Sequence, residues 1–505
     1  MTEIDSKLNS KIEISSIDDN DQSSTSFNKV KKAVEQDGFY TYEEEKRLLR
    51  KIDLRLMPLL ILLYLCKNLD VNNISYIITM NKDTGHNVLK QLNMTRDDWA
   101  WTSTIYYIPF ILFEIPSTIL MKKTSPRVHQ FRISFLWGIA TICHAAVKNK
   151  QGLYGLRFAL GLFEAGQFPG SLLHLCYFYR PDEVTTRMAF LGVLGSFSSI
   201  LTAFITYGFS FTSGNVGNLS GWQWVYISEG AFTIISSIII LYYLPNYPDS
   251  VNWLTEEEKS YIIARLPPQS PKSTDEDFKF KDLIESLKSK ILWGFSGVKV
   301  FQILGTYGLS FWLPSIIQDF GLSDPAKAPL LSIPSATASV ISGIYFSYLV
   351  DRSYFPPGLL CFVSLIVSLI AFIILTTVQI KGVLYAFIIF ATCSSAADGS
   401  VLTSWLGQSM EGSSKVGFAF SFANSIAQLG GILGAQIFRS KYAPRYTIPY
   451  AICLSFIGVA AILVIYLWYI TRDTTNKFMR ERRQRLKQRN ANLQAKPIYN
   501  HSEFQ

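Results

Sequence analysis

Long apolar runs dominate this sequence, and they limit what it can fold into. Twelve stretches of the 505-residue chain are long and apolar enough to cross a bilayer as helices, which takes about 20 residues. A backbone inside lipid must satisfy its own hydrogen bonds, so we expect helices rather than strands. The predicted spans are residues 58–79, 99–120, 132–148, 151–179, 187–210, 223–244, 291–319, 329–350, 356–378, 382–405, 416–438 and 446–470.

The spans fall into two sets of six, separated by a polar stretch. We therefore predict an all-α membrane protein with twelve transmembrane helices in two six-helix halves. The predicted regions are an N-terminal tail that we expect to be disordered (1–50), a first half (51–244), a central loop (245–290), a second half (291–470) and a basic tail (471–505).

The distribution of Lys and Arg predicts the orientation. Segments on the side of the two chain ends carry about twice as many of these residues as the opposite loops, so both termini are expected in the cytoplasm. The net charge of +9 is then mostly a topology signal, and nucleic acid is not an expected partner. Asn93 and Asn218 begin N-x-S/T sequons in predicted outer loops and are candidates for glycosylation.

Twelve spans in two halves suit a secondary transporter, which binds its substrate near the midplane between the halves. A channel or a membrane-embedded enzyme could share the number of spans. An enzyme should show a catalytic cluster, and the sequence has no HExxH, GxSxG or P-loop motif and no metal-ligand spacing. We therefore predict neither an enzyme nor a bound metal or cofactor.

Several ionisable residues lie inside the predicted spans. Burying a charged group in a membrane costs free energy, so such residues often have a function. The other interpretation is pairing within the bundle, or side chains that reach the membrane surface from helix ends. We favour this second interpretation for Glu229 and Lys299, and neither for Glu114. The full set is Lys67, Asp70, Glu114, Arg157, Glu164, His174, Glu229, Lys299 and Asp398.

Arg157 and Glu164 stand out because their spacing places them together. Seven residues are about two helical turns, so the side chains share one face, about 10 Å apart along the axis, with Gly161 between them and Phe168 continuing the stripe. Arginine stays charged and can hold a carboxylate through two parallel hydrogen bonds. A glutamate among apolar helices can exchange a proton near neutral pH. The pair suggests proton-coupled uptake of an anion.

The segment RFALGLFEAGQFPG (157–170) resembles the fourth-helix motif of the anion:cation symporter branch of the major facilitator superfamily. Other segments resemble the fungal allantoate permease family within it, in order from about residue 45 to 472. They are YIPFILFEIPSTILMKK, GWQWVYISEG, TYGLSFWLPSIIQDFGLS and APRYTIPYA. The resemblance implies a major facilitator fold and import of a small organic anion, such as allantoate, nicotinate or pantothenate, driven by protons, with no cofactor.

The resemblance also implies roles for individual residues. Asp70 and Glu164 match the positions that carry protons in related symporters, and Arg157 matches a substrate-binding arginine. The first-helix motif departs from the family pattern, because Val71 stands where a cation is usual. Lys67, on the same face as Asp70, is a candidate replacement for that cation, or else a group that neutralises Asp70.

Further candidates come from the second half. Asn424 and Gln428 lie one turn apart in a segment that resembles the eleventh helix of the family, and Tyr307 is an aromatic candidate for substrate contact. The pair Asp351 and Arg352 resembles a cytoplasmic gating loop of the superfamily.

Taken together, the sequence predicts a monomeric carrier of a small organic anion and protons in the plasma membrane. Two alternatives stay open: a nutrient receptor that does not transport, and an exporter or organellar carrier of the same fold.

Overall fold

The computed structural model describes residues 40, 42–82, 84–266, 287–322, 324, 326–409 and 413–495. Most of the predicted N-terminal tail and parts of the central loop and the basic tail lie outside these residues. The helices of the first half are α3 (Tyr42–Ile77), α4 (Val88–Gln91), α5 (Arg96–Lys123), α6 (Pro126–Cys143), η1 (His144–Ala146), α7 (Lys150–Glu164), α8 (Gln167–Phe178), α9 (Pro181–Gly195), α10 (Phe197–Phe209), α11 (Gly221–Tyr243), η2 (Pro248–Ser250) and α12 (Glu256–Arg265).

The second half is also helical. Its elements are α14 (Lys290–Asp319), α15 (Ala328–Leu331), α16 (Ile333–Asp351), α17 (Pro357–Thr377), α18 (Lys381–Ser409), α19 (Ser413–Ala427), α20 (Leu429–Ile437), η3 (Ser440–Tyr442) and α21 (Thr447–Ala495). A short antiparallel hairpin, β1 (Ser213–Val216) and β2 (Leu219–Ser220), precedes α11.

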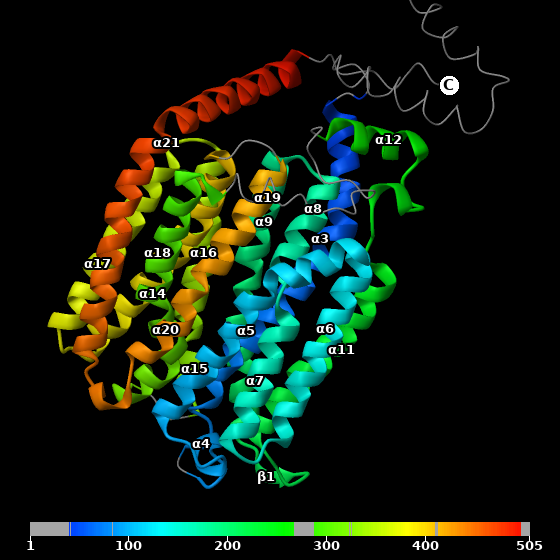
Figure 1. Ribbon diagram of the computed structural model, residues 1–505. Helices are drawn as coiled ribbons and strands as arrows, with labels where there is room; N and C mark the ends of the chain where they lie inside the picture. The colour runs from blue at the N-terminus through cyan, green and yellow to red at the C-terminus, as the bar shows by residue number, and fades with distance from the viewer. Residues whose placement is uncertain are drawn as a thin grey trace, which may run out of the picture.

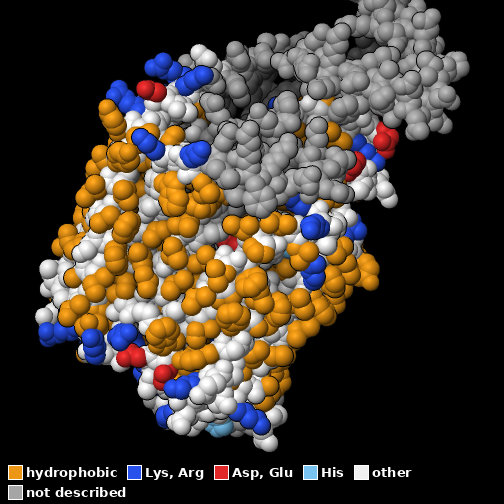
Figure 2. Space-filling model, in the orientation of Figure 1, with side chains coloured by type: hydrophobic (Ala, Val, Ile, Leu, Met, Phe, Trp, Pro, Cys, Tyr) orange, Lys and Arg blue, Asp and Glu red, His pale blue; other side chains and the backbone are white. Residues whose placement is uncertain are grey.

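The surface matches a membrane environment. Among the described residues, nine helical segments are long and apolar enough to cross a bilayer. Figure 2 shows a broad apolar surface across the visible face of the bundle, with most Lys, Arg, Asp and Glu gathered toward its two ends. The prediction of an all-α membrane protein is therefore confirmed.

The two halves stand side by side (Figure 1). Helices α3 to α11 form one half and α14 to α21 the other, and the halves meet where α3, α5, α9 and α10 face α14, α16, α18 and α20. The start of α3, helix α12 and the last part of α21 lie at one end, which we call the α12 end. Helix α4 and the β1–β2 hairpin lie at the opposite end, which we call the β1 end.

Helix α3 begins at Tyr42, so the end of the predicted N-terminal tail is helical rather than disordered. Three glutamates in its first turn favour a helix start, and Leu48 and Ile52 are buried. Helix α12 holds this turn in place, because Lys51 Nζ lies 2.7 Å from Glu258 Oε2 and Arg265 Nη1 lies 3.0 Å from Glu45 Oε1. Contacts with α12, which lies more than 200 residues away in the sequence, stabilise the start of α3. A pattern of apolar residues cannot predict such contacts.

Four spans that we predicted as continuous are each two helices. The chain breaks between α7 and α8, between α9 and α10 at Ser196, between α15 and α16 at Ser332, and between α19 and α20 at Gln428. At the first break Gly166 has φ +89°, and a Cβ there would lie 2.3 Å from Ser117 Oγ. Phe168 follows this break, so the prediction that it continues the Arg157 stripe is wrong.

The two sequons lie at the β1 end. Asn93 is exposed just before α5, and Asn218 is exposed in the turn of the hairpin, each with φ +55°. Both asparagines therefore face the same side of the bundle, opposite α12 (Figure 1).

Candidate functional site

Helix α7 presents one buried stripe to the rest of the first half. Its buried residues are Leu153, Arg157, Leu160, Gly161 and Glu164. Gly161 allows close packing, because a Cβ there would lie 2.1 Å from the backbone oxygen of Tyr106 on α5. Arg157 and Glu164 therefore lie on one face, as their spacing predicts, and α5 packs directly against that face.

Glu164 is the last residue of α7 and is fully buried. The hydroxyl of Tyr106 donates a hydrogen bond to Glu164 Oε2 at 2.5 Å. The other oxygen, Oε1, has no hydrogen-bond partner among the described residues. A buried carboxyl with one engaged oxygen and one open oxygen can accept a proton without breaking its existing contact.

Arg157 is 2% exposed, and its hydrogen bonds to described residues go to neutral groups. Its Nη2 donates to Tyr226 OH at 2.7 Å and to Asn73 Oδ1 at 3.3 Å, while Nε has no partner in the described chain. Asn73 in turn donates through Nδ2 to Glu229 Oε2 at 2.8 Å. These contacts fix the orientation of the guanidinium group and leave its charge without a direct counter-ion.

For Glu229 we favoured pairing within the bundle or a side chain that reaches the membrane surface, and the structure shows the pairing and not the surface position. Glu229 is 1% exposed and bonded to Asn73, so it belongs to the interior network. Sequence reasoning also missed Asn73 and Tyr226. The available signal was helical spacing: Tyr226 and Glu229 are three residues apart on α11, as are Asp70 and Asn73 on α3.

Asp70 is fully buried on α3, with the Thr141 side chain near its carboxylate, and neither oxygen makes a hydrogen bond of normal geometry to a described residue. A buried carboxylate with so little compensation is costly when ionised, so Asp70 is a second candidate for holding a proton. Its electrostatic neighbours are Glu164, Glu229 and Arg157, which places all four ionisable groups in one region.

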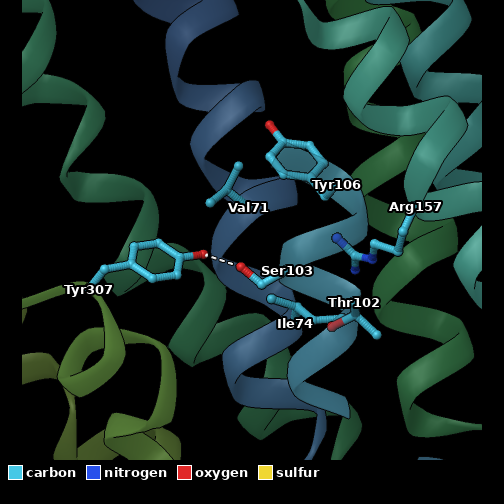
Figure 3. Close-up of a pocket in the computed structure, with 7 residues that line it drawn as sticks. All are labelled: Val71, Ile74, Thr102, Ser103, Tyr106, Arg157 and Tyr307. Atoms are coloured by element: carbon cyan, nitrogen blue, oxygen red, sulfur yellow. Dashed lines mark hydrogen bonds between the residues drawn. The ribbon is translucent and has the colours of Figure 1, made fainter. Parts of the chain in front are cut away.

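A pocket lies between the two halves, lined by residues of α3, α5 and α7 on one side and of α14 on the other. Figure 3 shows Arg157 pointing into it from α7, and Tyr307 entering from the second half, where its hydroxyl lies 3.0 Å from Ser103 Oγ. Val71 and Ile74 add apolar wall from α3. The lining residues are Val71, Ile74, Thr102, Ser103, Tyr106, Arg157 and Tyr307.

Three other predicted contact residues lie outside this pocket lining. Lys67 is half-buried one turn before Val71, with Nζ 5.6 Å from the centre of the Phe110 ring. Asn424 lies within hydrogen-bonding reach of Glu114. Gln428 occupies the break between α19 and α20, and its side chain has no hydrogen bond to a residue that the structure describes.

Glu114 links the two halves nearer the α12 end. It is 1% exposed on α5, and Ser425 on α19 donates a hydrogen bond to its Oε2. Its other oxygen lacks a partner within the described ranges. The predicted gating pair lies away from this contact: Asp351 ends α16, and its side chain lies outside what the structure describes, while Arg352 is exposed beside the Tyr348 ring.

The halves are also joined at the β1 end, by a group that we call the Asp319 cluster: Asp319, Tyr446, Arg96 and Lys82. Asp319, at the end of α14, lies 2.5 Å from Arg96 Nη1 of the first half. Tyr446 OH donates to Asp319 Oδ2 at 2.5 Å, and Lys82 Nζ lies 4.0 Å from Oδ1. These contacts hold the halves together on the β1 side of the pocket.

Comparison with known proteins gives relatives that are transporters. The chain is 31% identical over 447 residues to an uncharacterized transporter of Schizosaccharomyces pombe, covering 86% of this chain and 85% of that one. It is 30% identical over 303 residues to a putative tartrate transporter of Agrobacterium vitis, covering 58% of this chain and 65% of the relative.

A solved structure shares the fold. The xylose transporter XylE from E. coli, in a partially occluded inward-open conformation, matches with a TM-score of 0.62 and 14% identity, covering 81% of this chain and 96% of that one. The family model described as Major Facilitator Superfamily matches residues 60–435. With this match, the shared fold and the transporter relatives, the chain belongs to the Major Facilitator Superfamily and is a membrane transporter.

Proposed function

We propose that this transporter imports a small organic anion together with protons, by alternating access of a central pocket. The observation that carries the proposal is Arg157. It is buried, points into the pocket between the halves, and in the described part of the chain its hydrogen-bond partners are neutral side chains. A fixed cation without a direct counter-ion attracts an anion that can desolvate against it.

Protons enter the proposal through Glu164 and Asp70. Each has at least one open carboxylate oxygen, and both lie in the electrostatic neighbourhood of Arg157. When an anion occupies Arg157, like-charge repulsion favours the protonated form of nearby carboxyl groups. Anion binding and proton binding then support each other, which is the basis of symport.

The proposal also covers the substrate class, the membrane location, the topology and the oligomeric state. The resemblance to the allantoate permease family supports a carboxylate as substrate, and one relative is named a putative tartrate transporter. We further propose plasma-membrane location, cytoplasmic termini, glycosylation at Asn93 or Asn218 and a monomeric carrier. Under this orientation, the Asp319 cluster closes the outer side of the pocket.

The test is an uptake screen. Cells that lack endogenous carriers express the chain at pH 5 and receive labelled small carboxylates and sulfonates, with and without an uncoupler. The proposal expects one anion to accumulate, and the uncoupler to abolish its accumulation. Absence of accumulation of every anion, with the protein present at the cell surface, would contradict the proposal and favour a receptor. Fluorescent tagging separates the plasma membrane from an organelle.

A further inference from the structure

We propose that the pocket selects anions with a single negative charge, and that Val71 is the position that excludes a second negative charge. This inference rests on the proposed function, because it assumes that the pocket around Arg157 receives an anion. It adds the charge class of the substrate and a residue that determines it.

The lining of the pocket supplies the first argument. Among the described residues that line it, Arg157 alone carries a charge. In Figure 3 Arg157 enters from one side, and Val71 and Tyr307 lie on the opposite side. A carboxylate held by Arg157 therefore directs the remainder of the molecule toward a neutral wall of Val71, Ile74 and a tyrosine ring.

A second carboxylate on such a molecule would face that wall without a cation. Burying an ion without a partner costs far more than burying an apolar group of the same size. The neighbouring hydroxyls can donate to a charge but cannot neutralise it: Ser103 and Tyr307 already share a hydrogen bond at 3.0 Å. The same wall favours an aliphatic or aromatic body, which gains from contact with Val71 and Ile74.

Lys67 is the nearest group that could weaken this argument, since it lies one turn before Val71 on α3. Its ammonium group lies over the Phe110 ring, which is not part of the pocket lining. The acidic groups that act electrostatically on Lys67 are Glu164 and Glu114, which also lie outside the pocket lining. We therefore assign Lys67 to the proton-binding region rather than to the substrate.

The preferred occupant is thus a monocarboxylate. Its dicarboxylate analogue with the same carbon skeleton should bind at least about tenfold more weakly, since charged hydrogen bonds contribute on this scale.

The experiment compares matched anions on the purified full chain at pH 7 by thermal unfolding. The pairs are benzoate with phthalate, butyrate with succinate, and nicotinate with pyridine-2,3-dicarboxylate. A ligand that binds only the folded state raises the melting temperature, and at equal ligand concentration a tighter ligand raises it more. We expect at least one monocarboxylate to stabilise the protein and its dicarboxylate partner to have little effect.

Two variants then test the role of Val71 in excluding a second negative charge. Val71→Lys supplies a cation on the neutral wall, and we expect it to raise the affinity for the dicarboxylate at least about tenfold. Val71→Met has a similar length without charge and should leave the preference unchanged. If a dicarboxylate stabilises the wild-type chain as well as its monocarboxylate does, the inference is overturned while anion binding stands, and loss of that effect in Lys67→Met would identify the second cation.

The wild-type comparison decides the inference even if a variant fails to fold. If no anion of any pair stabilises the wild-type chain, Arg157 does not hold a carboxylate. That outcome overturns the proposed function, and the charge-class inference with it, so the two failures are distinguishable.

Discussion

At the scale of single residues, Arg157 is held by acceptors that fix its direction without cancelling its charge. Tyr226 OH and Asn73 Oδ1 both accept from Nη2, and Asn73 is itself fixed by Glu229. A direct carboxylate partner would occupy the guanidinium group and compete with a substrate. The nearby carboxyl groups do not bond to Arg157 directly. They act on the arginine charge through space and can exchange protons.

We expect Arg157→Ala to weaken anion uptake by on the order of 100-fold or more, because the substrate loses a buried charged pair of hydrogen bonds. Arg157→Lys should restore part of the activity, since lysine keeps the charge but not the planar fork. Radiolabelled uptake, corrected for surface expression, measures both. Arg445→Ala removes an exposed arginine and is the control. Uptake of normal affinity in Arg157→Ala would remove this residue from the substrate site.

Glu164→Gln keeps the size of the side chain and an oxygen that accepts from Tyr106, but it cannot release a proton. We expect the variant to lose accumulation against a concentration gradient and to retain exchange of internal for external anion. Counterflow in proteoliposomes, compared with net accumulation, separates the two activities. Accumulation that persists in the variant would move the coupling proton elsewhere, with Asp70 as the next candidate.

At the scale of helices, two glycines position the site. Gly161 lets α5 lie directly on α7, which brings Tyr106 to Glu164. Gly166 adopts φ +89° and ends α7 just after Glu164, so the carboxyl group stands at a helix break rather than within a continuous span. Helix breaks at membrane depth are tolerated where the backbone is buried in protein.

We expect Gly161→Ala to destabilise the protein by about 1–3 kcal/mol, because the added methyl group meets the Tyr106 backbone and forces α5 away from α7. Thermal unfolding of the purified protein measures the change. Gly155→Ala, on the exposed face of the same helix with nothing within 4 Å of the added Cβ, is the matched control. Equal melting temperatures for the two variants would show that close packing at Gly161 contributes nothing.

The sequence predicted most of the helices, but it predicted few of the hydrogen bonds around Arg157. Apolar runs indicated the helices, and a spacing of seven placed Arg157 and Glu164 on one face. The bonds that join Arg157 to Asn73 and Tyr226 connect three helices distant in the chain, and no local pattern specifies such a contact. The break at Gly166 was hidden because its left-handed backbone depends on packing against Ser117.

At the scale of the whole molecule, the pocket lies between halves that are joined on both sides. The Asp319 cluster joins them at the β1 end, and the contact of Ser425 with Glu114 joins them nearer the α12 end. Alternating access requires that these connections break in turn.

We expect Asp319→Asn to loosen the β1 end, because Arg96 and Lys82 lose their shared carboxylate. Spin labels on Asn93→Cys and Lys441→Cys, with exposed Cys143 replaced by Ser, would report a longer and broader distance distribution. Asp324→Asn, which removes an exposed ion pair with Lys327, should leave the distribution unchanged. An unaltered distribution in Asp319→Asn would mean that other contacts hold this end closed.

The central claim is that one transport cycle moves an anion and protons together. Its most direct test uses proteoliposomes with a pH-sensitive dye inside, equal pH on both sides, and the anion identified by the uptake screen added outside. The account predicts acidification of the lumen that depends on the anion and is absent in Arg157→Ala vesicles. Entry of the labelled anion without any movement of protons would contradict it.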